Sequence, residues 1–344
     1  MNSWERVVRT LNFENVDVLP TIGDASNRAV QEFYGGETLT EENKEEVAFR
    51  AALAIFDIAV GLPVIRTPSI QEYDGWITET QEWTGWIKKR PFLSSDDCLR
   101  DMKRFIDTTD PNRIDTEECR KAYAPWIKLA REFKLKSSAF GMYVDVGIQG
   151  AYHRYGLELF SYSYAENPDL VSKFIDTSSR YNFNKILPAI DPEFCPLFEL
   201  GSDVAFKNGL LFPPQFLRKH YIPYLEIAAN ALHQKGIKAY VHSDGDVSQI
   251  IADIVATGID GLHPIDPSAG MSIRKVRKRF PKLFILGGID GRNMAFGTPE
   301  MVKKEVQQAI ETAGPNYFVG VSGNIYEGIP VDNVKAMLGV VRGE

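Results

Sequence analysis

The sequence predicts a single α/β domain over residues 1–344, folded as a (β/α)8 TIM barrel. Short apolar runs alternate with longer amphipathic stretches, which indicates parallel strands connected by helices. Eight such runs are present, and eight is the number of strands that closes a barrel. In chain order the runs cover residues 18–22, 54–60, 138–144, 196–200, 238–241, 258–262, 283–286 and 317–321.

Helical spacing of apolar residues predicts helices between these runs, for example over residues 216–233, 247–256 and 299–313. The last of these begins at Thr298-Pro299-Glu300, which supplies an N-cap, a proline in the first turn and an acid near the positive helix end. Gly236 and Gly314 stand where left-handed C-caps are expected. An open doubly wound sheet is the alternative, but no Gly-x-Gly-x-x-Gly follows the first run.

Residues 69–92 have a different pattern, in which Trp76, Trp83 and Trp86 alternate with polar residues. This alternation predicts a β-hairpin inserted after the second strand, where it forms part of the barrel rim.

Composition narrows the classes of function. The net charge of -7 argues against sequence-independent nucleic-acid binding, which needs clustered basic residues. No apolar stretch is long enough to span a membrane, and the start of the chain lacks the apolar segment of a secretory signal. The three cysteines, Cys98, Cys119 and Cys195, are far apart, so no Cys-x-x-Cys site exists. We therefore expect a cytoplasmic protein.

Polar residues gather at or just after the predicted strands. In a barrel of this type the reacting groups lie at the carboxyl ends of the strands. The surplus of carboxylates together with two histidines predicts a site for a cation, a metal or a proton transfer. These residues are Asp24, Asp57, Asp145, Glu199, Asp203, His242, Asp244, Asp246, His263, Asp266, Asp290, Ser322 and Asn324.

Several of these residues have a structural interpretation as well. Asp246 precedes a helical stretch and fits an N-cap. His263 lies before Pro264 in an apolar run and can hydrogen-bond within the core. Asp57 stands inside an apolar run, where it must be paired or have a raised pKa. The tyrosines near residue 152 fit a pocket for a flat organic substrate or ordinary packing.

Six stretches of the chain carry a resemblance to a known family: residues 5–11, 209–224, 242–246 (His-Ser-Asp-Gly-Asp), 257–266, 286–290 (Leu-Gly-Gly-Ile-Asp) and 323–337. The chain resembles the uroporphyrinogen decarboxylase superfamily, which also contains corrinoid-dependent methyltransferases. The resemblance runs nearly end to end and is most specific in the C-terminal half.

The decarboxylase branch is the weaker match within this superfamily. Its members have an arginine-rich stretch near the N-terminus that binds the carboxylates of the substrate. Here residues 22–28 contain only Arg28, and Asn324 replaces the histidine of the family's final Gly-His-Gly. Tyr152 and Asp57 match that branch loosely.

The methyltransferase branch is the closer match, and resemblance to it implies zinc. The ligands in that branch are a histidine and a cysteine after the fifth strand and a cysteine in the last loop. His242 matches the histidine, whereas Asp244 and Asn324 stand where the cysteines are expected. Two interpretations remain open: a metal bound by His242, Glu199 and Asp244, or a metal-free acid–base pair of His242 and Asp244.

The resemblance implies transfer of a methyl group from a small donor, such as a methoxylated aromatic in an O-demethylase reaction, to a partner corrinoid protein. Alternatives are a decarboxylase of heme biosynthesis and a non-catalytic barrel that binds a corrinoid or tetrapyrrole. A homodimer is also expected. The predicted catalytic residues are His242, Asp244, Asp290 and Asp57, and the predicted substrate-binding residues are Tyr152, Asp145, Asn324, His263 and Trp83.

Overall fold

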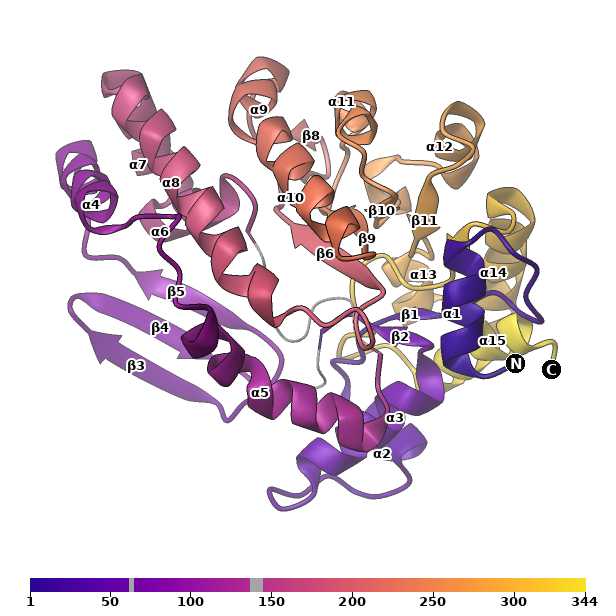
Figure 1. Cartoon of the computed structure of the whole chain (residues 1–344). Helices are drawn as coiled ribbons and strands as arrows, with labels where there is room; N and C mark the ends of the chain where they lie inside the picture. Colours follow the sequence, from indigo (N-terminus) through magenta and orange to yellow (C-terminus); the bar gives the residue numbers. More distant parts are fainter. Residues whose placement is uncertain (62–64, 137–144) are drawn as a thin grey trace.

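The computed structural model of the chain describes residues 1–61, 65–136 and 145–344 and shows an α/β fold built on parallel strands (Figure 1). Five strands pair in the order β12-β11-β10-β9-β6, and β1 pairs with β2. A bridge between Thr21 and Val319 joins these two groups in parallel. The strands are β1 (Ile22–Gly23), β2 (Ile58–Ala59), β6 (Leu197–Gly201), β9 (Lys238–His242), β10 (Gly261–His263), β11 (Phe284–Leu286) and β12 (Tyr317–Phe318).

The two outer strands of this parallel arrangement, β2 and β6, contact Lys136 and Asp145 respectively. Asp145 forms a parallel bridge with Gly201 of β6, and the amide of Ala59 in β2 donates to the carbonyl of Lys136 at 2.9 Å. The strand predicted at 138–144 lies outside the described residues.

Helices surround the strands (Figure 1), and of the three predicted by their residue ranges one has the expected bounds and two differ. Thr298 caps α14 and the helix ends before Gly314, as predicted, but Gly314 has φ +72° and ψ -159°, which is not the expected left-handed helical conformation. The helix predicted at 216–233 is broken at Tyr221, because Pro223 cannot donate a backbone hydrogen bond. The helix predicted at 247–256 begins only at Ile251.

The helices are α1 (Ser3–Leu11), α2 (Arg28–Gly35), α3 (Lys44–Ile55), α4 (Ser95–Thr108), α5 (Thr116–Phe133), α6 (Gln149–Tyr155), α7 (Leu157–Glu166), α8 (Pro168–Ile186), α9 (Pro214–His220), α10 (Ile222–Gln234), α11 (Ile251–Ala256), α12 (Ile273–Arg279), α13 (Gly291–Phe296), α14 (Pro299–Ala313) and α15 (Val331–Arg342). Among the described residues, no helix has both the length and the apolar character required to cross a membrane.

The segment predicted as a hairpin forms a three-stranded antiparallel sheet instead of two strands. It consists of β3 (Ser69–Tyr73), β4 (Trp76–Thr80) and β5 (Gly85–Lys89) and extends to one side of the parallel strands (Figure 1). A second, small antiparallel pair, β7 (Ala205–Phe206) and β8 (Gly209–Leu210), follows β6.

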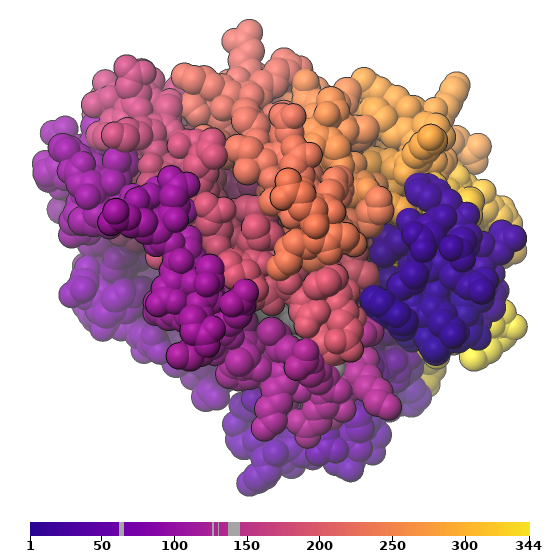
Figure 2. Space-filling model, viewed as in Figure 1, coloured from indigo at the N-terminus to yellow at the C-terminus, as the bar shows by residue number. Residues whose placement is uncertain are grey.

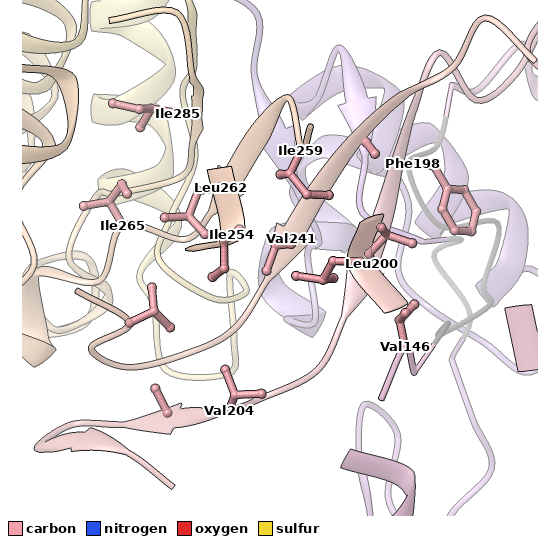
Figure 3. Close-up of a cluster of buried hydrophobic side chains, with 14 of the residues drawn as sticks. Val146, Phe198, Leu200, Val204, Val241, Ile254, Ile259, Leu262, Ile265 and Ile285 are labelled. Atoms are coloured by element: carbon pink, nitrogen blue, oxygen red, sulfur yellow. The ribbon is translucent and has the colours of Figure 1, made fainter. Parts of the chain in front are cut away.

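Alternation along the parallel strands separates two faces. Phe198, Val241, Leu262 and Ile285 take one set of alternate positions and join the buried cluster of Figure 3, together with Ile254 of α11. The other set forms a second apolar cluster, against which α1 packs. Its members are Val7, Leu11, Ile22, Ile58, Leu197, Tyr240, Phe284, Leu286 and Phe318.

The N-terminal segment thereby covers the amino ends of the strands. Phe13, just after α1, stacks on Phe284 with ring centroids 5.1 Å apart. Figure 2 shows this indigo segment in contact with orange and yellow parts of the C-terminal half. The amino ends are thus apolar and closed, whereas the carboxyl ends are left for polar side chains.

His220 gives the folded protein a dependence on pH that can be measured. Its ring lies buried between Phe216 and Tyr164, and its Nε2 is 3.2 Å from the Tyr164 hydroxyl. Burial, with a smaller effect of Lys219, lowers the pKa of His220 to about 4.

We expect the free energy of unfolding to fall as the pH decreases from about 6.5, the pKa of an unfolded histidine, towards 4. Over this pH range the histidine binds a proton in the unfolded state but stays neutral in the folded state. In His220→Gln this part of the pH dependence disappears. Urea denaturation of both proteins between pH 4.5 and 7 measures this difference. If the free energy of unfolding depends on pH in the same way in both proteins, His220 is not the source of the dependence.

Candidate active site

Three ionisable side chains meet at the carboxyl ends of β6, β9 and β10. His242 and His263 are neighbours in the parallel register, and Glu199 is the register partner of Tyr240, two residues before His242. The two Nδ1 atoms lie 2.7 Å apart. Glu199 and His263 are only 7% and 3% exposed. We call Glu199, His242 and His263 the inner group.

This inner group follows directly from strand periodicity. Tyr240 and His242 are two residues apart in β9, so both side chains lie on the face that carries the apolar cluster below. Leu197 and Glu199 are related in the same way in β6. The first layer is therefore apolar, and the next layer towards the carboxyl ends is polar.

The two imidazoles differ in charge. Burial, and then the neighbouring His242, lower the pKa of His263 well below its usual value. Burial also lowers the pKa of His242, but the carboxylates of Glu199, Asp244 and Asp203 outweigh it and raise the pKa above its usual value. His242 is therefore the more basic of the two imidazoles, and the Nδ1 atoms lie at hydrogen-bonding distance from each other.

Two further carboxylates face the other ring nitrogen of His242. Its Nε2 is 3.7 Å from Oδ1 of Asp203 and 3.9 Å from Oδ1 of Asp244. The Asp244 side chain is 61% exposed, so it stands at the mouth of the site. We call Asp203 and Asp244 the outer pair.

Asp203 is held in place by α6. Its Oδ2 accepts from Nε2 of Gln149 at 3.1 Å, and its own amide donates to Oε1 of Gln149 at 2.7 Å. The hydroxyl of Tyr152 donates to its carbonyl at 2.8 Å, and the amide of Asp244 donates to its Oδ1 at 2.9 Å. Gln149 is a positioning residue that the sequence analysis did not identify.

Asp145, which was predicted to bind substrate, instead holds the start of α6 in place. It accepts from the Ser202 hydroxyl at 2.6 Å and from the first amides of α6, Gln149 and Gly150. Burial raises its pKa. In these contacts Asp145 acts as the cap of α6, and it places Gln149 and Tyr152 beside Asp203.

Asp57 lies apart from these residues, at the amino ends of the strands. It directly precedes β2, forms an ion pair with Nη1 of Arg6 at 2.5 Å, and accepts from the amide and hydroxyl of Thr21 at 2.9 and 3.1 Å. The reason is that residues 54 and 55 belong to α3 and the strand begins only at Ile58, so Asp57 starts the strand.

Three other predicted residues lie outside the inner group. Asp290 caps α13 and pairs with Arg292 at 2.7 Å, which lowers its pKa. Trp83, in the turn between β4 and β5, packs on the cluster of Leu39, Val47, Ala48 and Ile65. Asn324 is exposed in the loop after β12. No described contact joins Asp290, Trp83 or Asn324 to the inner group.

Comparison with known families identifies the class of protein. The family model for uroporphyrinogen decarboxylase (URO-D) matches residues 160–343, more than half of the chain. The chain therefore belongs to this family, which confirms the resemblance inferred from its sequence. Comparison with curated proteins finds no match.

A solved structure shares the fold over its whole length. A methyltransferase from Methanosarcina mazei superposes with a TM-score of 0.63 at 15% sequence identity, covering 100% of this chain and 99% of the other. At this identity the likeness establishes the arrangement of helices and strands, and the chemistry must be argued from the site.

Proposed function

We propose that this protein is a methyltransferase that moves a methyl group from a small methylated donor to a corrinoid carried by a partner protein. The observation that carries the proposal is the inner group with its outer pair at the carboxyl ends of the strands. His242 matches by position the histidine ligand of the corrinoid-dependent methyltransferases that the sequence resembles. The name of the Methanosarcina mazei structure supports the same class.

The residues present fit a divalent metal ion. Two sets of ligand atoms lie within 4.8 Å of one another and share His242: Glu199 with His263, and Asp203 with Asp244. When bound there, such an ion would withdraw electron density from the donor oxygen and make it a better leaving group.

The transfer breaks the bond between the methyl carbon and its oxygen and forms a bond between that carbon and reduced cobalt, which supplies both electrons. The oxygen keeps the electrons of the broken bond and takes up a proton. Asp244 is exposed at the mouth of the site, with Oδ1 3.9 Å from Nε2 of His242, and this position lets it deliver that proton.

The donor class we propose is a methoxylated aromatic compound. Support comes from Tyr152, which lies beside Asp203 and stacks edge-on with His153. Trp76 contacts Phe92 and Trp83 packs elsewhere, so the aromatic rim expected from the sequence contributes less than predicted.

Porphyrinogen decarboxylation is the less favoured alternative, because its substrate carries many carboxylates that need cationic partners. Arg28, the one arginine in the stretch that resembles the family's clamp, is paired with Glu82 at 2.6 Å. We also propose a closed eight-stranded barrel with the antiparallel sheet as an insertion, a homodimer, and a cytoplasmic location.

The proposal is tested by incubating the purified protein with reduced cobalamin, zinc and a panel of methoxybenzoates. We expect the visible spectrum to change from that of cob(I)alamin to that of methylcobalamin, with release of the matching phenol. Methylation from none of the donors, together with release of carbon dioxide from uroporphyrinogen, would overturn it in favour of the decarboxylase.

A further inference from the structure

His263 has no role in the ligand set expected from the sequence, yet its Nδ1 lies 2.7 Å from Nδ1 of His242. We propose that Glu199, His242 and His263 together bind one divalent transition-metal ion, and that the outer pair, Asp203 and Asp244, does not. This replaces Asp244 by His263 in the ligand set. The inference concerns the binding of the ion and stands independently of what group is transferred.

The ligand atoms of the inner group lie close enough together to converge on one ion. Metal–nitrogen bonds of about 2.0–2.1 Å in a tetrahedral site place two ligand nitrogens roughly 3.3 Å apart, somewhat farther than in this structure. The Nδ1 atoms of His242 and His263 are 2.7 Å apart, and an oxygen of Glu199 lies within 4.8 Å of the ligand nitrogens of both. Small rotations of two side chains would open the nitrogens to receive the ion.

The chemistry of the inner group favours a cation as its occupant. In the hydrogen bond between the Nδ1 atoms of His242 and His263, one proton is shared by two nitrogen lone pairs. The buried carboxylate of Glu199 lies beside this pair. A divalent ion would satisfy both nitrogens and the carboxylate together. Tyr240 already orients Glu199, since its hydroxyl donates to Oε2 at 2.6 Å, as supporting hydrogen bonds commonly do for metal ligands.

The backbone next to His263 is shaped to its ring. Gly287 has φ +71°, and a Cβ there would lie 3.2 Å from Cδ2 and 3.3 Å from Nε2 of His263. Glycine at this position, directly after β11, therefore lets the backbone pass close to the imidazole. The ligand set is thus carried by rigid strands and not by loops.

The side chains of the outer pair make other contacts or face solvent. Both oxygens of Asp203 already accept hydrogen bonds, from Gln149 and from the amide of Asp244. Asp244 is exposed and 3.9 Å from Nε2 of His242. These contacts suit residues that line the entrance to the ion, where substrate arrives.

Two imidazoles and one carboxylate define the class of ion. Imidazole suits zinc, cobalt, iron, nickel and copper, whereas calcium and magnesium prefer oxygen ligands alone. Three protein ligands also leave a fourth position open, as in catalytic zinc sites. We therefore expect zinc or cobalt(II) to bind and magnesium or calcium not to compete.

The experiment is titration of the metal-free full-length protein with Zn²⁺ and Co²⁺, followed by calorimetry and by the visible absorption of Co²⁺. We expect one equivalent to bind and a tetrahedral Co²⁺ spectrum. Glu199→Gln and His263→Gln should each weaken binding more than about 100-fold, beyond the loss typical of a supporting hydrogen bond. Asp203→Asn and Asp244→Asn should weaken it less than about 10-fold.

His233→Gln is the matched control, because His233 is paired with Asp260, is 35% exposed and lies outside the site. Circular dichroism and thermal melting identify any variant that does not fold. If His263→Gln does not fold, the test depends on Glu199→Gln, in which the new side chain has the same size as the native one. The inference is overturned if the wild-type protein binds neither ion, or if binding survives His263→Gln and is lost in Asp244→Asn. A protein that methylates cobalamin but binds neither Zn²⁺ nor Co²⁺ would overturn the inference and leave the proposed function intact, whereas a protein that binds the ion as expected but methylates no cobalamin would do the reverse.

Discussion

Replacing His242 by glutamine is expected to reduce methyl transfer by roughly 100-fold to 10,000-fold, the range seen when a proton-transfer or metal-binding group is removed from an active site. His242 is the one residue shared by both sets of possible ligands, and its two ring nitrogens face His263 on one side and the outer pair on the other. Glutamine removes the imidazole from both. The measurement is the initial rate of cobalamin methylation at saturating donor.

His233→Gln serves as the control for this prediction too, because it removes a histidine outside the site. We expect the control to keep its full rate and His242→Gln to keep its melting temperature within a few degrees. A His242→Gln variant that methylates cobalamin at the wild-type rate would place the chemistry elsewhere on the protein.

Sequence analysis located the centre of the site because polar residues stand at the ends of short apolar runs. Glu199 lies near the end of one such run and His242 directly follows another, so both were expected at the carboxyl ends of strands. The partnership of His242 with His263 required the register between β9 and β10, which no single run specifies. His263 was therefore expected to bind substrate, without a specific partner.

Other residues depended on where elements begin. The run at 54–60 reads as one strand, but its first two residues complete α3, since Ile55 packs in the core as part of that helix. A shift of this size moves Asp57 from the predicted strand interior to its amino end. Gln149 gave no signal, because an uncharged side chain in a short helix is common on any surface.

The fold itself was more predictable than the contacts. Alternation of apolar runs and amphipathic stretches indicated parallel strands, and capping residues such as Thr298 and Gly314 indicated the ends of α14. The antiparallel sheet at 69–89 has three strands where a hairpin was expected, because the third strand pairs along its length with the second through Trp86 and Ile87.

Asp57→Ala is expected to lower the free energy of unfolding by about 3–5 kcal/mol, the cost of breaking a buried ion pair. The Arg6 and Asp57 side chains are only 14% and 8% exposed, so the largely buried guanidinium would lose one of its two carboxylate partners. The amide and hydroxyl of Thr21, also buried, would lose an acceptor. Urea denaturation at pH 7 measures the change.

The same arginine offers a control, because Asp17 pairs with Nε of Arg6 at 3.0 Å and is 39% exposed. Asp17→Ala should cost less than about 1 kcal/mol, as for other solvent-exposed ion pairs. The rate of methyl transfer distinguishes a structural role from a catalytic one: the folded Asp57→Ala protein should keep the wild-type rate. A variant with unchanged stability and a strongly reduced rate would instead restore Asp57 to the catalytic residues, and it would require the amino ends of the strands to take part in the reaction.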